Sequence, residues 1–131
     1  MNTKSQFVNI RRILYANAIF SGLSGLIFTF ASKPIATFLG IAPSSGIILA
    51  LGIGLMVFAN VIYIFAKREE IPKRYVLFII IADSLWVLDS ILLLVTGWVP
   101  FTLESKWAVG IIAVIVDLFA MLQFFEWRKM D

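Results

Sequence analysis

The chain alternates four long apolar stretches with short polar segments. The apolar stretches cover about 10–31, 46–66, 75–96 and 106–127. At a rise of about 1.5 Å per residue, roughly twenty helical residues cross the hydrocarbon core of a bilayer. The pattern therefore predicts an all-α membrane protein, a single domain over residues 1–131 that forms a four-transmembrane-helix bundle.

The segments between the spans carry helix start and stop signals. In the first loop Ser32 can cap a helix, Pro34 suits its first turn and Gly40 can end it, so we expect a short helix lying in the membrane interface. Thr102 is a candidate N-cap for the fourth helix, and Glu104 suits the positive end of its dipole.

Basic residues set the expected orientation. Only Lys33 and Lys106 lie in the first and third loops. The other nine of the eleven Lys and Arg residues lie in the N-terminal arm, the middle loop and the C-terminal tail, namely Lys4, Arg11, Arg12, Lys67, Arg68, Lys73, Arg74, Arg128 and Lys129. The positive-inside rule predicts that both termini are cytoplasmic, in a multi-pass protein of the bacterial inner (plasma) membrane.

Composition narrows the chemistry. The chain is 61% hydrophobic with a mean hydropathy of +0.98, and it contains no Cys and no His. Disulfides, thiol catalysis, cysteine or histidine zinc sites and Ser-His nucleophiles are thereby excluded, and we predict neither a metal site nor a cofactor. The net charge of +3 is explained by topology, so no nucleic-acid partner is expected.

A stripe of small residues marks the second span. Gly46, Ala50 and Gly54 recur every four residues, and the first span has a weaker version in Ser21 and Gly25. Small residues at this spacing let a neighbouring helix approach closely. The stripe of the second span predicts a homo-oligomer that forms through Gly46, Ala50 and Gly54.

The third span carries acidic residues where the chain should be most apolar. Asp83 and Asp89 flank Trp86, and Asp117 lies at the middle of the fourth span. Ionisable groups inside a bilayer are costly and are usually functional. We therefore take Asp83 and Asp117 as candidate catalytic groups, and as ligand-binding candidates the polar residues that converge on one layer of the four spans: Asn17, Ser21, Ser24, Asn60, Asp83, Trp86, Ser90, Asp117 and Gln123.

Helical periodicity predicts which of these candidates share a face. Asn17, Ser21 and Ser24 lie on one stripe of the first helix, and Asp83, Trp86 and Ser90 lie on one stripe of the third. The simplest packing sets these stripes against each other, with Asp117 and Asn60 nearby. Asp89 is rotated by about 120° from Asp83, so the two need not share a partner.

Each candidate also has a purely structural interpretation. Asn17, Asn60 and Gln123 are residue types that often join membrane helices by hydrogen bonds. Trp86 can simply pack in the core, and a protonated Asp83 can donate a hydrogen bond to Asn17 or to a backbone carbonyl.

Three functions fit these residues. No Lys or Arg lies within the membrane core, so the site suits a proton, a cation or a small neutral or lipophilic ligand that is bound or transported. The first alternative is a membrane-embedded enzyme in which Asp83 or Asp117 is the acid or base for a lipophilic, isoprenoid-like substrate. The second is an accessory subunit of a larger membrane complex.

Four sequence pieces resemble those of small uncharacterised bacterial four-span membrane proteins. They are ANAIFSGLSG at 16–25, ATFLGI at 36–41, DSLWVLDS at 83–90 and FAMLQ at 119–123. The resemblance implies a four-span bundle and brings no activity, cofactor or substrate. A coarser likeness to DoxX-like proteins is limited to size and number of spans.

Overall fold

The computed structural model describes residues 8–41, 45–97 and 101–130, and Lys4 lies outside them. Its elements are α2 (Val8–Phe30), α3 (Ser32–Leu39), α4 (Ser45–Ala66), α5 (Lys73–Thr96) and α6 (Leu103–Lys129). Of these, α2, α4, α5 and α6 are long and apolar enough to cross a membrane. The predicted helical, multi-span architecture is therefore confirmed, and each span ends within about three residues of its predicted bound.

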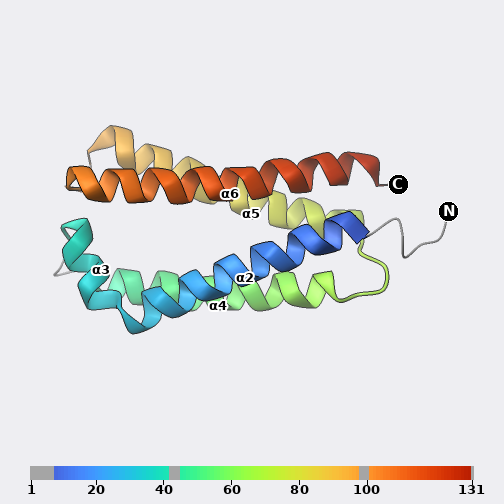
Figure 1. Ribbon diagram of the computed structural model, residues 1–131, viewed down its shortest axis with the longest axis horizontal. Coiled ribbons are helices and arrows are strands. Elements are labelled where there is room, and N and C mark those ends of the chain that lie inside the picture. The colour runs from blue at the N-terminus through green and yellow to red at the C-terminus, as the bar shows by residue number, and fades with distance from the viewer. Residues whose placement is uncertain (1–7, 42–44, 98–100, 131) are drawn as a thin grey trace.

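The long helices form two pairs. α2 packs against α4, and α5 packs against α6. The pairs lie close together where α2 begins and α6 ends, and they diverge towards α3 (Figure 1). We call these two ends of the bundle the termini end and the α3 end.

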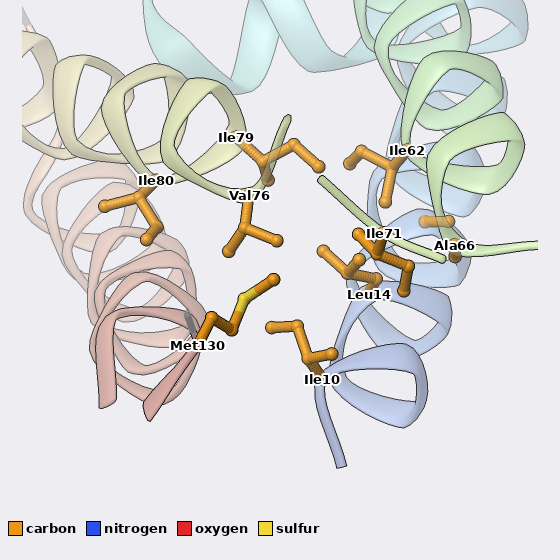
Figure 2. Close-up of a cluster of buried hydrophobic side chains, with 10 residues drawn as sticks. Ile10, Leu14, Ile62, Ala66, Ile71, Val76, Ile79, Ile80 and Met130 are labelled. Carbon is orange, nitrogen blue, oxygen red and sulfur yellow. The ribbon is translucent and has the colours of Figure 1, made fainter. Parts of the chain in front are cut away.

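An apolar cluster joins the pairs at the termini end (Figure 2). Its side chains come from α2, α4, α5, the loop before α5 and the end of α6, and they are Ile10, Leu14, Ala18, Ile62, Ala66, Ile71, Val76, Ile79, Ile80 and Met130. Because lipid tails are as apolar as these side chains, the cluster stabilises the bundle through close packing more than through removal from water. It fills the space between the helices at this end with hydrocarbon.

Two glycines let α2 and α4 touch backbone to backbone. A Cβ atom added to Gly25 would lie 2.8 Å from the Gly52 carbonyl oxygen, and one added to Gly52 would lie 2.7 Å from the Thr29 nitrogen. By contrast, a Cβ at Gly46 or Gly54 would meet open space. The close approach therefore uses Gly25, part of the weaker predicted stripe, together with Gly52, which lies outside the stripe predicted for the second span.

α3 follows α2 almost without interruption. Gly40 ends α3 in the left-handed conformation, with φ of 81°, as the sequence predicts. The predicted cap at Ser32 is wrong, because Ala31 occupies the N-cap position and makes no side-chain cap hydrogen bond. The helical hydrogen bonds continue across the junction: the Ala31 N–H donates to the Ile27 carbonyl, and the Ile35 N–H donates to Ala31.

α3 is attached to the start of α6. Thr102 caps α6 as predicted, and its hydroxyl accepts a hydrogen bond from the Ser105 N–H at 3.1 Å. The buried Ser105 hydroxyl donates to the Phe38 carbonyl near the end of α3. A polar contact thus bridges the two helix pairs at the α3 end.

Arg11 fastens α2 to the end of α4. Its Nε donates to the Ala66 carbonyl at 2.9 Å, and its Nη2 donates to the Arg68 carbonyl at 2.7 Å. The last carbonyls of a helix have no partner within the helix, and Arg11 donates hydrogen bonds to those at the end of α4. Arg11→Ala is expected to lower the free energy of unfolding by about 1.5–3 kcal/mol, as for hydrogen bonds to charged groups.

Arg12→Ala is the matched control, because Arg12 is exposed and its removal changes the topological charge equally. It should leave the stability unchanged within about 0.5 kcal/mol. Chemical unfolding of both variants in detergent micelles, followed by circular dichroism, measures the difference. Equal losses in the two variants would show that charge, and not the contact with α4, is what matters.

Candidate functional site

Three buried side chains from three helices form a closed polar ring. Asn17 of α2 donates through Nδ2 to Asp83 Oδ2 of α5 and to Gln123 Oε1 of α6, both at 2.8 Å. Gln123 Nε2 donates to the same Asp83 oxygen at 3.0 Å. Their exposed fractions are 2%, 4% and 0%, so the bonds lie in a medium where hydrogen bonds are strong and unpaired polar groups are costly. We call Asn17, Asp83 and Gln123 the polar ring.

Ser21 sets the orientation of the ring. Its hydroxyl donates to Asn17 Oδ1 at 3.1 Å from one helical turn away. Because Oδ1 accepts from Ser21, the amide nitrogen of Asn17 is turned towards Asp83 and Gln123, and both of its hydrogens have an acceptor. The sequence predicts that the Asn17 and Asp83 stripes face each other, and the structure brings both residues into contact.

The ring supplies Asp83 with donors only. Two amide N–H groups converge on Oδ2, so this oxygen acts as an acceptor and carries no proton. The structural interpretation in which Asp83 donates to Asn17 predicts the reverse direction. The Asn17 carbonyl oxygen that would receive such a proton already accepts from Ser21.

The ring lies between the apolar cluster and a cavity. Asn17 is one turn beyond Leu14 of the cluster, and Asp83 is one turn beyond Ile79. On the side towards α3, a cavity of about 270 Å³ is lined by residues of all four long helices: Phe20, Ser21, Ser24, Phe28, Ala50, Leu51, Gly54, Leu55, Phe58, Ala82, Asp83, Trp86, Ile112 and Val116. Asp83 is the one titratable residue in this wall.

The cavity reaches the surface along α4. Ala50, Leu51 and Gly54 line it and are exposed. At this level α4 is paired with α2 and is not closely packed on α5. In a membrane, the surface beside α4 would contact acyl chains, so the opening faces the bilayer and not the water at either end.

Several polar atoms of the wall have no partner among the described residues. They are the second carboxylate oxygen of Asp83, the hydroxyl of Ser24 and the indole N–H of Trp86. None of them belongs to the fully buried polar atoms that lack a partner, which in the described part of the chain comprise only the Trp127 indole nitrogen. These three groups are the ones that the wall can offer to an occupant.

The structure separates four other acidic or polar positions from the cavity. Asp117 and Asp89 are exposed and neither lines the cavity, so Asp117 does not join Asp83 in the cavity as the predicted packing would place it. Asn60 is also exposed, and its amide donates to the Met56 carbonyl of its own helix at 3.2 Å. Ser90 is buried but donates to the Trp86 carbonyl at 2.9 Å, away from the cavity wall.

Sequence reasoning missed the aromatic part of the wall. Phe20, Phe28 and Phe58 join Trp86 around the cavity. Phe28 continues the stripe of Asn17 and Ser24 by one more helical turn, so extending the stripe would have found it. Phe58 carries no such signal, because its position depends on how α4 crosses α2.

Comparisons of the chain with models of protein families, with curated proteins and with solved structures find no match. The geometry of the site is therefore the basis for assigning its function. That geometry consists of a braced carboxylate, a mostly aromatic and aliphatic wall, and an opening on the lipid-facing side of the bundle.

Proposed function

We propose that this chain is a membrane protein that binds a small, largely apolar ligand in the cavity next to Asp83. The observation that carries the proposal is the cavity itself, which ends at a carboxylate held in place by two other helices. Its volume of about 270 Å³ is just below the roughly 300–1,000 Å³ of pockets for drug-sized ligands. It exceeds the roughly 150 Å³ engineered cavity that binds benzene. A molecule of one or two rings fits this space.

Binding is better supported than free conduction of a proton or an inorganic cation. The apolar cluster fills the bundle between the ring and the termini end, and it offers such an ion no polar group. Transport of the ligand would require the helix pairs to separate at this cluster. Entry from the bilayer along α4 requires no such movement.

The orientation and the membrane belong to the same proposal. The excess of Lys and Arg around the termini end supports cytoplasmic termini in a bacterial plasma membrane. The amphipathic α3 then lies at the opposite interface. A homo-oligomer through Gly46, Ala50 and Gly54 would instead cover the opening beside Ala50 and Gly54, so it is an alternative to ligand entry along α4.

A membrane-embedded enzyme is the second candidate, because the cavity brings a lipophilic molecule to the carboxylate of Asp83. Acid–base chemistry usually needs a second titratable group for the returning proton. Asp117, the other candidate acid or base, is on the outer face of α6, and the cavity wall has no further one. The geometry therefore favours binding. Nothing in the described residues favours the accessory subunit over either.

Thermal unfolding in detergent micelles tests ligand binding. Neopentylbenzene, a neutral one-ring hydrocarbon, is expected to raise the Tm by roughly 5 °C at concentrations well above its Kd, because it binds only the folded chain. Gly54→Trp should abolish the rise, since the Gly54 position lines the cavity and the new ring has open space to enter.

Gly46→Trp is the control, because it adds the same ring to the same helix at an exposed position outside the cavity wall. It should keep the rise in Tm. If neopentylbenzene shifts the Tm of both variants equally, the effect comes from the micelle, and the proposed cavity site is rejected.

A further inference from the structure

An ionised Asp83 has no counter-charge in the polar ring. Its Oδ2 receives two amide N–H groups, and neutral amides do not cancel the charge of a carboxylate. An isolated charge in a medium of low dielectric constant is costly unless an opposite charge lies close by. Asp83 has no salt bridge in the described part of the chain, where the one ion pair joins Lys129 and Glu126.

The chain itself does not supply the missing cation. In the described helices, Lys and Arg lie near the helix ends, and none lines the cavity. Arg11, for example, is committed to carbonyls at the end of α4. The positive charge that would keep Asp83 ionised must therefore come with whatever occupies the cavity.

The wall discriminates between kinds of cation. A metal ion takes several oxygen ligands, but the side chains of the wall offer oxygen only from Asp83, Ser21 and Ser24. Around these atoms stand four aromatic rings, Phe20, Phe28, Phe58 and Trp86. Aromatic faces attract an organic ammonium by cation–π interaction, and they also accommodate its alkyl or aryl groups.

We infer that the ligand of this cavity is a lipophilic organic cation, an ammonium with alkyl or aryl groups that enters from the bilayer along α4. This inference rests on the proposed function and names the chemical class of its ligand. The ammonium lies against the free oxygen of Asp83, and its apolar groups lie among the aromatic rings. The opening beside the exposed Ala50 and Gly54 receives the molecule from the acyl chains.

A pair of probes with the same shape tests the inference. Benzyltrimethylammonium and neopentylbenzene differ in one central atom, a positive nitrogen in the first and a neutral carbon in the second. Their Kd values for the wild-type chain are measured by isothermal titration in micelles, each corrected for uptake by protein-free micelles. The cation is expected to bind roughly tenfold more tightly or better, because only it gains the carboxylate and the ring faces.

Asp83→Asn assigns the preference to the carboxylate. The asparagine carbonyl oxygen can still accept from Asn17 and Gln123, so the ring and the cavity persist while the charge is lost. The preference for the cation over neopentylbenzene should vanish. Asp89→Asn is the matched control: it removes an exposed aspartate from the same helix and should keep the preference.

The possible outcomes distinguish ligand binding in the cavity from the inference that the ligand is a cation. If both probes bind the wild-type chain equally, the inference fails and ligand binding stands. If neither probe binds, both fail. A preference that survives in Asp83→Asn overturns the role of Asp83.

Should Asp83→Asn not fold, Trp86→Leu replaces it. It is expected to weaken the cation more than neopentylbenzene, and an equal loss for both would contradict the inference.

Discussion

Asn17→Leu is expected to lower the free energy of unfolding by about 3 kcal/mol or more, because it leaves several buried polar groups without partners at about 1–3 kcal/mol each. A single hydrogen bond between membrane helices is worth only about 0.6 kcal/mol on average, so an isolated Asn would matter little. Asn17 differs because its amide joins both other members of the ring. Leucine would leave Asp83 with one donor and Ser21 without its acceptor.

Asn60→Leu is the matched control for this experiment. Asn60 is the same residue type inside a span, but it is exposed and its amide bonds only to its own helix. Leucine there should be neutral or slightly stabilising, because it places an apolar side chain against lipid. Reversible unfolding in mixed micelles, followed by tryptophan fluorescence, gives both values. Losses of similar size would mean that the ring contributes no more than ordinary polar side chains.

A double variant checks whether Asn17 acts through Asp83. In Asn17→Leu combined with Asp83→Asn, the neutral amide no longer needs two donors. The combined loss should therefore be smaller than the sum of the two single losses by about 1 kcal/mol or more. Strictly additive losses would show that the two side chains stabilise the bundle independently, despite their 2.8 Å contact.

The spans and the depth of the polar residues could be predicted from the sequence. Helix length is dictated by bilayer thickness, and capping residues such as Thr102 act locally, so both leave a clear pattern. Depth follows from position along a helix, which is why Asn17, Asp83 and Gln123 could be assigned to one layer. Depth alone does not establish that two residues face each other.

The side of each helix that faces the bundle axis was predicted less well. For α6, helix geometry alone shows that one of the two candidate residues must face outward. Asp117 and Gln123 are six residues apart on α6, a rotation of about 240°, so they cannot both face the bundle axis. The structure turns Gln123 inward, with 0% of its surface exposed, and Asp117 outward. The prediction favours Asp117 because a carboxylate is costlier in lipid than an amide. Which of the two faces inward depends on partners on other helices. Gln123 faces inward because it bonds to Asn17 of α2 and Asp83 of α5.

The cavity itself could not be predicted from the sequence, because it depends on the angle between the helix pairs. α2 and α4 meet where Gly25 and Gly52 allow backbone contact, whereas α4 and α5 are not closely packed against each other. The predicted stripe of Gly46, Ala50 and Gly54 was interpreted as a packing surface. Ala50 and Gly54 instead lie at the opening of the cavity, where small side chains leave it unobstructed.

Gly52→Ala should be the most damaging single-methyl change in α4. The new Cβ would lie 2.7 Å from both the nitrogen and the hydroxyl of Thr29 and 2.9 Å from the Gly25 carbonyl oxygen. Two of these three atoms are backbone, so no rotamer change relieves the contact and α2 must move away from α4. A loss of about 2 kcal/mol or more in the free energy of unfolding is expected, towards the upper part of the range for overpacked cores.

Gly54→Ala is the control that separates this steric effect from helix propensity. It makes the same substitution on the same helix, but the new Cβ meets open space. Alanine favours helix over glycine by about 1 kcal/mol, so this control should be neutral or stabilising. Unfolding of both variants in mixed micelles gives the two stabilities, and the neopentylbenzene shift reports on the cavity. If α2 and α4 must separate to fit the methyl group, Gly52→Ala should also weaken probe binding, because the two helices contribute most of the wall. A Gly52→Ala chain as stable as wild type would mean that the helices need not touch at this point, and the shape of the cavity would then have to be set by another contact.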